Sequence, residues 1–188
     1  LGTTLDPYLT KSDALSGNVL GGTVTYAALT ARAMGLKVGI LTSCSPSLDI
    51  TPLSGVEVMV QPSGHTTTFE NISRGNQRTQ FLYRVADPID AGNLPDAWRR
   101  VKLVHLGPVV NEINTAIIGA FPDSVVGLTP QGLLRGWTED QRVFYRRSPD
   151  LDKIMAGSRI VILSIEDVYG DETIIGAMAK SIPILVVT

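Results

Sequence analysis

Two adjacent glycines, Gly21 and Gly22, stand directly before an alanine-rich segment with a helical pattern, Thr23–Met34. Paired glycines let a ligand approach the backbone closely, and the N–H groups of a first helical turn can bind hydroxyl or anionic oxygens. A structural turn before a helix explains such a pair equally well. Gly35 then suits a helix end in the left-handed region.

Other polar residues that could do chemistry follow apolar, strand-like runs. Gln131 and Arg135 come after one such run, Val125–Leu128. Open α/β sheets bind ligands at the carboxyl ends of their strands, so these positions are candidates, although a loop cap is the simpler reading. His105 lies inside an apolar run and is predicted to be a core histidine.

Several familiar catalytic patterns are missing from the sequence. It contains no G-x-x-x-x-G-K-[ST] loop, no G-x-G-x-x-G fingerprint and no G-x-S-x-G elbow. The single cysteine, Cys44, excludes an intrachain disulfide and a zinc site built on paired cysteines. P-loop, dinucleotide-binding and serine hydrolase functions therefore lose their main support.

Short runs of β-branched and aliphatic residues predict parallel strands buried on both faces. These runs are Val38–Leu41, Leu103–Leu106, Val125–Leu128, Ile160–Leu163 and Ile184–Val187. Helical patterns lie between them at Thr23–Met34, Asn111–Phe121 and Asp171–Lys180. This alternation predicts a doubly wound, three-layer α/β/α sheet.

The middle of the chain predicts a small antiparallel layer that is solvated on one face. Its three expected strands are Val56–Gln61, Thr66–Ile72 and Thr79–Val85, with turn signals between them. Asn71, on the second of these strands, and Arg78, next to the third, are expected to be solvated.

Composition narrows the class of protein further. Hydrophobic residues make up 44% of the 188 residues and charged residues 18%, which predicts one folded domain. The net charge is −2, and the basic cluster of Arg142, Arg146 and Arg147 is expected on a solvated face, so no nucleic-acid partner is predicted. No apolar run approaches the ~20 residues that span a bilayer, which predicts a soluble cytoplasmic protein without a membrane partner.

The run from Gly21 to Gly39 closely resembles the N-terminal signature of the PfkB, or ribokinase-like, carbohydrate kinases. In that family a Gly-Gly pair opens a small-residue helix that ends in Leu-Gly or Met-Gly before a Lys-Val strand. The order and spacing of the later segments extend the resemblance over nearly the whole chain. Thr66–Phe69, Val104–Pro108 and Thr129–Arg135 resemble a branch related to inositol kinases.

The resemblance implies ATP-dependent phosphorylation of a hydroxyl on a sugar, polyol or nucleoside, with Mg²⁺ beside the nucleotide. Residues 1–188 would form an incomplete ribokinase-like domain, with lid strands from about residues 8–20 and 56–85. In related kinases such lids often pair, so a homodimer through the lid is expected.

The resemblance also assigns residues. Asp6 ends a segment like the family's first strand, where an Asp binds sugar hydroxyls, and Gly21 and Gly22 form the close-approach turn. Tyr26 stands where many members have Asn, and it is a candidate for the substrate site, as is Gln131. Asp167 aligns with the carboxylate of the family's N-x-x-E element and is the candidate Mg²⁺ residue.

The family's G-A-G-D motif, which carries the general base and the anion hole, does not occur in the sequence. No catalytic residue is therefore assigned, the base is expected beyond Thr188, and the 188 residues alone are expected to be inactive. Two alternatives stay open: a non-catalytic sugar- or polyol-binding protein on the same fold, and an unrelated Rossmann-like enzyme.

Overall fold

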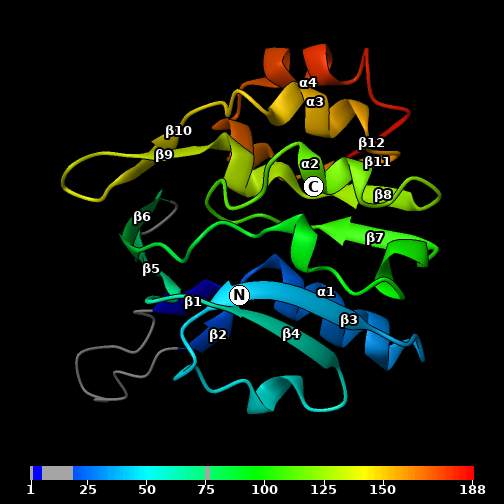
Figure 1. The fold of residues 1–188 in the computed structure, drawn as a ribbon. Coiled ribbons are helices and arrows are strands. Elements are labelled where there is room, and N and C mark those ends of the chain that lie inside the picture. The colour runs from blue at the N-terminus through cyan, green and yellow to red at the C-terminus, as the bar shows by residue number, and fades with distance from the viewer. Residues whose placement is uncertain (1, 6–18, 75–76) are drawn as a thin grey trace. The chain divides into compact units, whose positions relative to one another are not determined.

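The computed structural model describes residues 2–5, 19–74 and 77–188, and their packing divides the chain into two compact units (Figure 1). The first unit comprises Leu1–Asp87 with Trp137–Phe144, and the second comprises Pro88–Gly136 with Tyr145–Thr188. Within the part that the structure describes, no helix is long and apolar enough to cross a membrane.

The first unit contains a four-stranded sheet, here called the lid sheet, with the strand order β2-β1-β5-β6. Its strands are β1 (Gly2–Leu5), β2 (Val19–Gly21), β5 (Thr67–Arg74) and β6 (Gln77–Arg84). β1 runs antiparallel to β2 but parallel to β5, and β5 runs antiparallel to β6. The expected antiparallel layer is therefore mixed, and it recruits the chain's first strand.

The expected strand Val56–Gln61 exists, but it does not belong to the lid sheet. It forms β4 (Glu57–Pro62), which pairs in parallel with β3 (Gly39–Cys44). The assignment of this segment to the lid was wrong. Val56 and Val58 pack against the apolar cluster around Ala28, Ile40 and Leu53, and this burial holds β4 beside β3.

Helix α1 (Thr23–Ala33) confirms the predicted alanine-rich helix. Its end has the geometry that the sequence predicts, because Gly35 adopts φ 81° and the Leu36 N–H donates to the Ala31 carbonyl at 3.1 Å. Ala28 faces the core of the unit and is buried. A short 3₁₀ helix, η1 (Thr51–Leu53), completes the unit's helical elements in the described ranges.

The second unit is built on a four-stranded parallel sheet with the order β12-β11-β8-β7. Four of the predicted strands are found with the predicted bounds: β7 (Leu103–Leu106), β8 (Val125–Leu128), β11 (Ile160–Leu163) and β12 (Ile184–Val187). Val126, Leu128, Val161 and Leu163 are buried. Alternate residues such as Leu103, Ile162 and Ile184 are exposed, so the expected burial on both faces is not seen.

The helices of this unit are short. They are α2 (Ala116–Gly119), α3 (Leu151–Ala156) and α4 (Glu172–Met178), with 3₁₀ turns η2 (Ala91–Asn93), η3 (Trp98–Arg100), η4 (Pro130–Leu134) and η5 (Ile165–Val168). The prediction for α4 is confirmed, and Asp171 caps it by accepting from the Thr173 N–H at 2.9 Å. A further strand pair, β9 (Arg135–Trp137) and β10 (Val143–Tyr145), was not predicted.

Only Ala116–Gly119, within the second half of the predicted helix Asn111–Phe121, is helical. Asn111 adopts φ 55°, in the left-handed region. The Glu112 carboxylate accepts from the N–H groups of Val109 and Val110 at 2.7 and 2.6 Å, and the Asn114 side chain accepts from the Ala116 N–H at 2.9 Å. These side-chain hydrogen bonds compete with the helical backbone bonds and delay the helix start.

Candidate functional site

The Gly21-Gly22 turn joins β2 to α1 in a conformation that requires glycine. Gly22 has φ 89° and ψ 157°, a region of backbone space that is essentially restricted to glycine. Thr25, which is buried, fixes the turn from the helix side: its hydroxyl donates to the Gly21 carbonyl at 2.8 Å and its N–H donates to the Gly22 carbonyl at 3.2 Å. The conformation of Gly22 and the hydrogen bonds of Thr25 together fix the shape of the turn.

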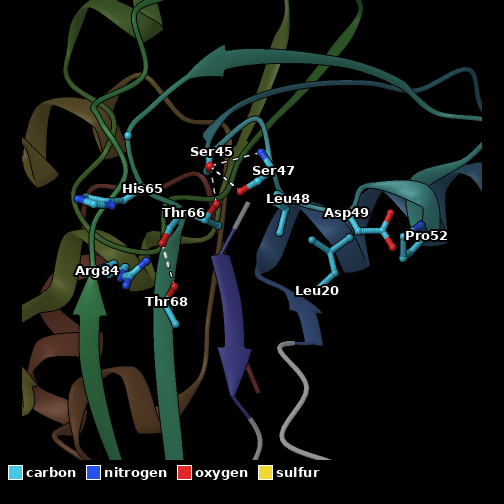
Figure 2. A pocket seen from close by; sticks show the side chains of 11 residues that line it. Leu20, Ser45, Ser47, Leu48, Asp49, Pro52, His65, Thr66, Thr68 and Arg84 are labelled. Atoms are coloured by element: carbon cyan, nitrogen blue, oxygen red, sulfur yellow. Dashed lines mark hydrogen bonds between the residues drawn. The ribbon is translucent and has the colours of Figure 1, made fainter.

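A cavity of about 350 Å³ begins at Leu20, the residue directly before this turn (Figure 2). Its lining comes from five segments of the first unit: β2, the loop and 3₁₀ turn after β3, the loop between β4 and β5, and the strands β5 and β6. The residues are Leu20, Ser45, Ser47, Leu48, Asp49, Pro52, Gly64, His65, Thr66, Thr68 and Arg84. Its size falls in the range of small-molecule sites.

Hydroxyl groups give the cavity its polar character. Thr66 and Thr68 are two residues apart, so strand alternation turns both to the cavity, whereas Thr67 between them is buried and accepts from the Ala86 N–H at 3.0 Å. The Thr66 hydroxyl accepts from the Ser45 N–H at 3.0 Å, which ties the loop after β3 to β5. The hydroxyls of Ser45 and Ser47 share a 2.9 Å hydrogen bond.

The structure does not bring Tyr26 to this cavity. Its side chain is on α1, is 65% exposed, and is absent from the cavity lining in the described part of the chain. Asp6 lies outside the described residues, so its role stays a prediction.

A second group of polar side chains gathers in the second unit, where η4 and η5 follow the carboxyl ends of β8 and β11. The Gln131 side-chain amide donates to one Asp167 oxygen at 2.9 Å, and the Ser164 N–H donates to the other at 2.9 Å. Ser164 and Asp167 together form a capping box at the start of η5. The structure therefore joins Gln131 and Asp167, which are 36 residues apart.

This donor set does not fit a direct magnesium site. Both Asp167 oxygens already accept hydrogen bonds from the protein, and no cluster of three potential metal ligands of the His, Cys, Asp or Glu type occurs among the described residues. Mg²⁺ needs several oxygen ligands in near-octahedral geometry. Magnesium thus stays a prediction from resemblance, and no chemical step here is routed through it.

Comparison with solved structures identifies the fold. The sequence matches no protein-family model and no curated protein. A pyrophosphate-dependent kinase of the ribokinase family, solved with a pyrophosphate analogue and myo-inositol, matches 100% of this chain with a TM-score of 0.77 and 22% identity. The chain spans 70% of that kinase. This chain has the ribokinase fold.

More distant members show the same ribokinase fold. Fructokinase from Xylella fastidiosa, solved with bound ATP, has a TM-score of 0.64 and 14% identity over 100% of this chain and 68% of its own. Ribokinase from Thermotoga maritima has a TM-score of 0.61 and 11% identity over 99% of this chain and 67% of its own. The expectation of a ribokinase-like α/β fold is confirmed, and the unrelated Rossmann-like alternative is wrong.

Two other candidates in this ribokinase fold have structural partners. The Arg135 guanidinium donates to the Val109 carbonyl at 3.2 Å, and the Arg135 carbonyl accepts from the Asn111 side-chain amide at 3.0 Å, so Arg135 ties the start of β9 to the loop after β7. His105 was expected in the core, but its ring is accessible and its Nε2 lies 2.9 Å from the Thr129 hydroxyl. Partial burial by neighbouring groups still lowers the pKa of His105.

Sequence reasoning missed most of the cavity lining. It expected lid residues Asn71 and Arg78 to be solvated; Arg78 is exposed, whereas Asn71 is buried and accepts from Arg78 at 2.9 Å and from Gln80 at 2.6 Å. Strand alternation could have predicted part of the lining, because it places the hydroxyls of Thr66 and Thr68 on the same face of the strand and that of Thr67 on the other. The loop residues Ser45 and Ser47 carried no comparable signal.

Proposed function

We propose that the chain supplies the acceptor side of a kinase that transfers a phosphoryl group to a hydroxyl of a sugar or polyol. One observation carries the proposal: in a ribokinase fold, a hydroxyl-lined cavity begins at the residue before the glycine-only turn that opens α1. Hydroxyl side chains both donate and accept hydrogen bonds, as the hydroxyls of a sugar or polyol do.

In this proposal the Gly21-Gly22 turn lets the acceptor approach the backbone, and Asp6 binds acceptor hydroxyls. The acceptor oxygen forms the new P–O bond, the bond to the donor's leaving oxygen breaks, and the hydroxyl proton passes to a base. None of the described residues is assigned as that base. Positioning and electrostatic stabilisation dominate such reactions, and these residues would contribute positioning.

The phosphoryl donor is proposed to be ATP. A fructokinase with the same fold was solved with bound ATP. Because a ribokinase-family kinase was solved with a pyrophosphate analogue, pyrophosphate is the second donor to test. Magnesium would accompany either donor through its phosphate oxygens. Cytoplasmic location stays a prediction.

The test is an activity screen of the full-length protein with ATP or pyrophosphate as donor and a panel of sugars and polyols as acceptors. We expect acceptor-dependent formation of ADP or phosphate, with one phosphorylated product found by mass spectrometry. Donor hydrolysis that is independent of every acceptor, or no turnover with either donor, would count against a kinase.

A non-catalytic sugar- or polyol-binding protein is the second candidate, and the state of Asp167 favours it. This carboxylate is engaged by Gln131 and Ser164, so it serves the local structure of η5 in this chain. A thermal-shift screen of the same acceptors separates the two candidates, because a ligand that binds the native state raises the unfolding midpoint. Binding without any turnover would support the second candidate.

A further inference from the structure

We propose that Arg84, with His65 and Thr66, forms an anion-binding end of the cavity, and that the acceptor is a sugar or polyol bearing a phosphate or carboxylate group. This inference rests on the proposed function and names its substrate class. It depends on three independent features of the first unit: the strand register that aims Arg84, the charge balance of the lining, and the hydrogen-bond donors beside it.

A β-bulge directs Arg84 to the cavity. Along the β5–β6 pair, Glu70 faces Phe81 and Phe69 faces Leu82, but Thr68 then faces Arg84, so Tyr83 is an extra residue. An unbroken register would set Tyr83 opposite Thr68 and move Arg84 to the other face of the sheet. Bulges are over-represented next to active sites, where they re-aim a side chain.

The acid on the same face of β5 as Thr68 is occupied elsewhere. Glu70 lies two residues from Thr68 and so projects from the same face of β5, but its carboxylate accepts a hydrogen bond from the Tyr83 hydroxyl. That bond also raises the pKa of Tyr83. In the described part of the chain, the Arg84 side chain has neither a hydrogen bond nor an ion pair.

The acid within the cavity lining is also engaged. The Asp49 carboxylate accepts from the Thr51 N–H at 2.9 Å, and hydrogen bonds from the Thr51 side chain and backbone lower the pKa of Asp49. Figure 2 shows Asp49 beside Pro52, on the other side of the cavity from Arg84 and His65. The lining thus offers an unpaired cation at one end and a carboxylate already bound by the protein at the other.

The groups beside Arg84 are donors that suit an anion. The Thr66 hydroxyl oxygen accepts from the Ser45 N–H, which leaves its own proton to donate, and a His65 ring N–H adds another donor. A guanidinium matches the oxygen pair of a carboxylate or phosphate in a bidentate fork. A phosphate or carboxylate group accepts hydrogen bonds from Arg84, Thr66 and His65 without having to supply a hydrogen-bond donor itself.

The test measures binding to the full-length protein without a phosphoryl donor. The probes are matched pairs of a neutral and an anionic acceptor, namely fructose with fructose 6-phosphate, glucose with gluconate and myo-inositol with inositol 1-phosphate, and inorganic phosphate alone. Calorimetry should show that one anionic member binds at least about tenfold more tightly than its neutral partner, as a charge-assisted pair permits. The phosphate and carboxylate pairs distinguish the two sources of the charge.

Arg84→Ala should abolish that preference and the binding of inorganic phosphate, and Arg84→Lys should restore only part of it, since a lysine lacks the fork. The control is Arg159→Ala, which removes an exposed arginine just before β11 in the second unit and should leave the affinities unchanged. Circular dichroism confirms that each variant is folded. Equal affinity for neutral and anionic members, no binding of any probe, or unchanged binding in Arg84→Ala would overturn the inference.

Phosphoryl transfer, measured separately, keeps this inference distinct from the proposed function. Efficient phosphorylation of a neutral acceptor that is insensitive to Arg84→Ala would overturn the anion site and leave the kinase standing. Arg84-dependent anion binding without turnover would support the site and contradict the kinase. A raised KM for ATP or pyrophosphate with an unchanged acceptor KM would assign Arg84 to the donor and overturn the inference.

Discussion

At the scale of single residues, Gly22 combines an unusual backbone conformation with a proposed role in the approach of the acceptor. Its φ of 89° and ψ of 157° lie in a region that side chains with a Cβ atom avoid. Thr25 holds both glycine carbonyls, so the turn cannot relax without breaking a buried hydrogen bond. A substitution at Gly22 therefore tests whether the turn contributes both to the stability of the fold and to acceptor binding.

We expect Gly22→Ala to lower the free energy of unfolding by about 1–3 kcal/mol, the typical strain of such a conformation. Urea denaturation measures this loss. Acceptor affinity should fall in the same variant, because the new methyl group occupies the space for close approach.

Gly176→Ala is the matched control for this experiment. Gly176 is in the middle of α4, and an added Cβ would meet nothing within 4 Å. Since alanine favours a helix interior, the control should be more stable by about 0.5–1 kcal/mol. An unchanged unfolding free energy in Gly22→Ala would show that the turn is not strained by a side chain.

At the scale of elements, η4 depends on unusually close backbone packing. An added Cβ at Gly132 would lie 2.5 Å from the Pro108 carbonyl carbon and the Val109 nitrogen. The Gly132 N–H donates to the Pro108 carbonyl at 2.9 Å, and the Gly132 carbonyl accepts from the Asn111 N–H at 3.0 Å. This contact fixes η4, and with it the Gln131 side chain.

Gly132→Ala should therefore displace η4 and lower the free energy of unfolding by about 1–3 kcal/mol, the usual cost of overpacking. Thermal and urea denaturation measure the loss. Gly119→Ala is the control, because an added Cβ at the end of α2 meets nothing within 4 Å. Equal stability of the two variants would contradict the packing argument.

At the scale of the whole molecule, the lid sheet leaves one edge without a further strand in the described residues. β6 is covered in part, since the Leu82 N–H donates to the Gln141 carbonyl at 2.8 Å and Phe81 bridges to Arg142. β2 is the other edge strand, and Val19 on it is 56% exposed. Unprotected edges with apolar side chains favour pairing between chains.

We expect a homodimer through the lid sheet, seen as twice the chain mass by light scattering at tens of micromolar protein. Val19→Lys should shift the equilibrium toward the monomer, because a charged side chain blunts an edge strand. Val101→Lys changes another exposed valine, outside the lid sheet, and should leave the dimer intact. A wild-type monomer at this concentration would contradict the prediction.

The sequence by itself determined those parts of the fold that depend on local pattern. The bounds of β7, β8, β11 and β12 follow from continuous apolar runs, and those of α1 from its alanine content and the glycine after it. Side-chain burial and helix propensity act over a few residues, so both can be read along the chain. The left-handed conformation of Gly35 belongs to the same class, since a glycine directly after a helical pattern indicates that backbone requirement.

Only the tertiary structure decided which segments meet. It paired β4 with β3 instead of the lid sheet, joined Gln131 to Asp167 across 36 residues, and shortened the predicted helix before Phe121. It also turned Arg84 to the face of Thr68 by inserting Tyr83 as a bulge. Strand pairing and register depend on partners distant in sequence, so no local pattern contains them.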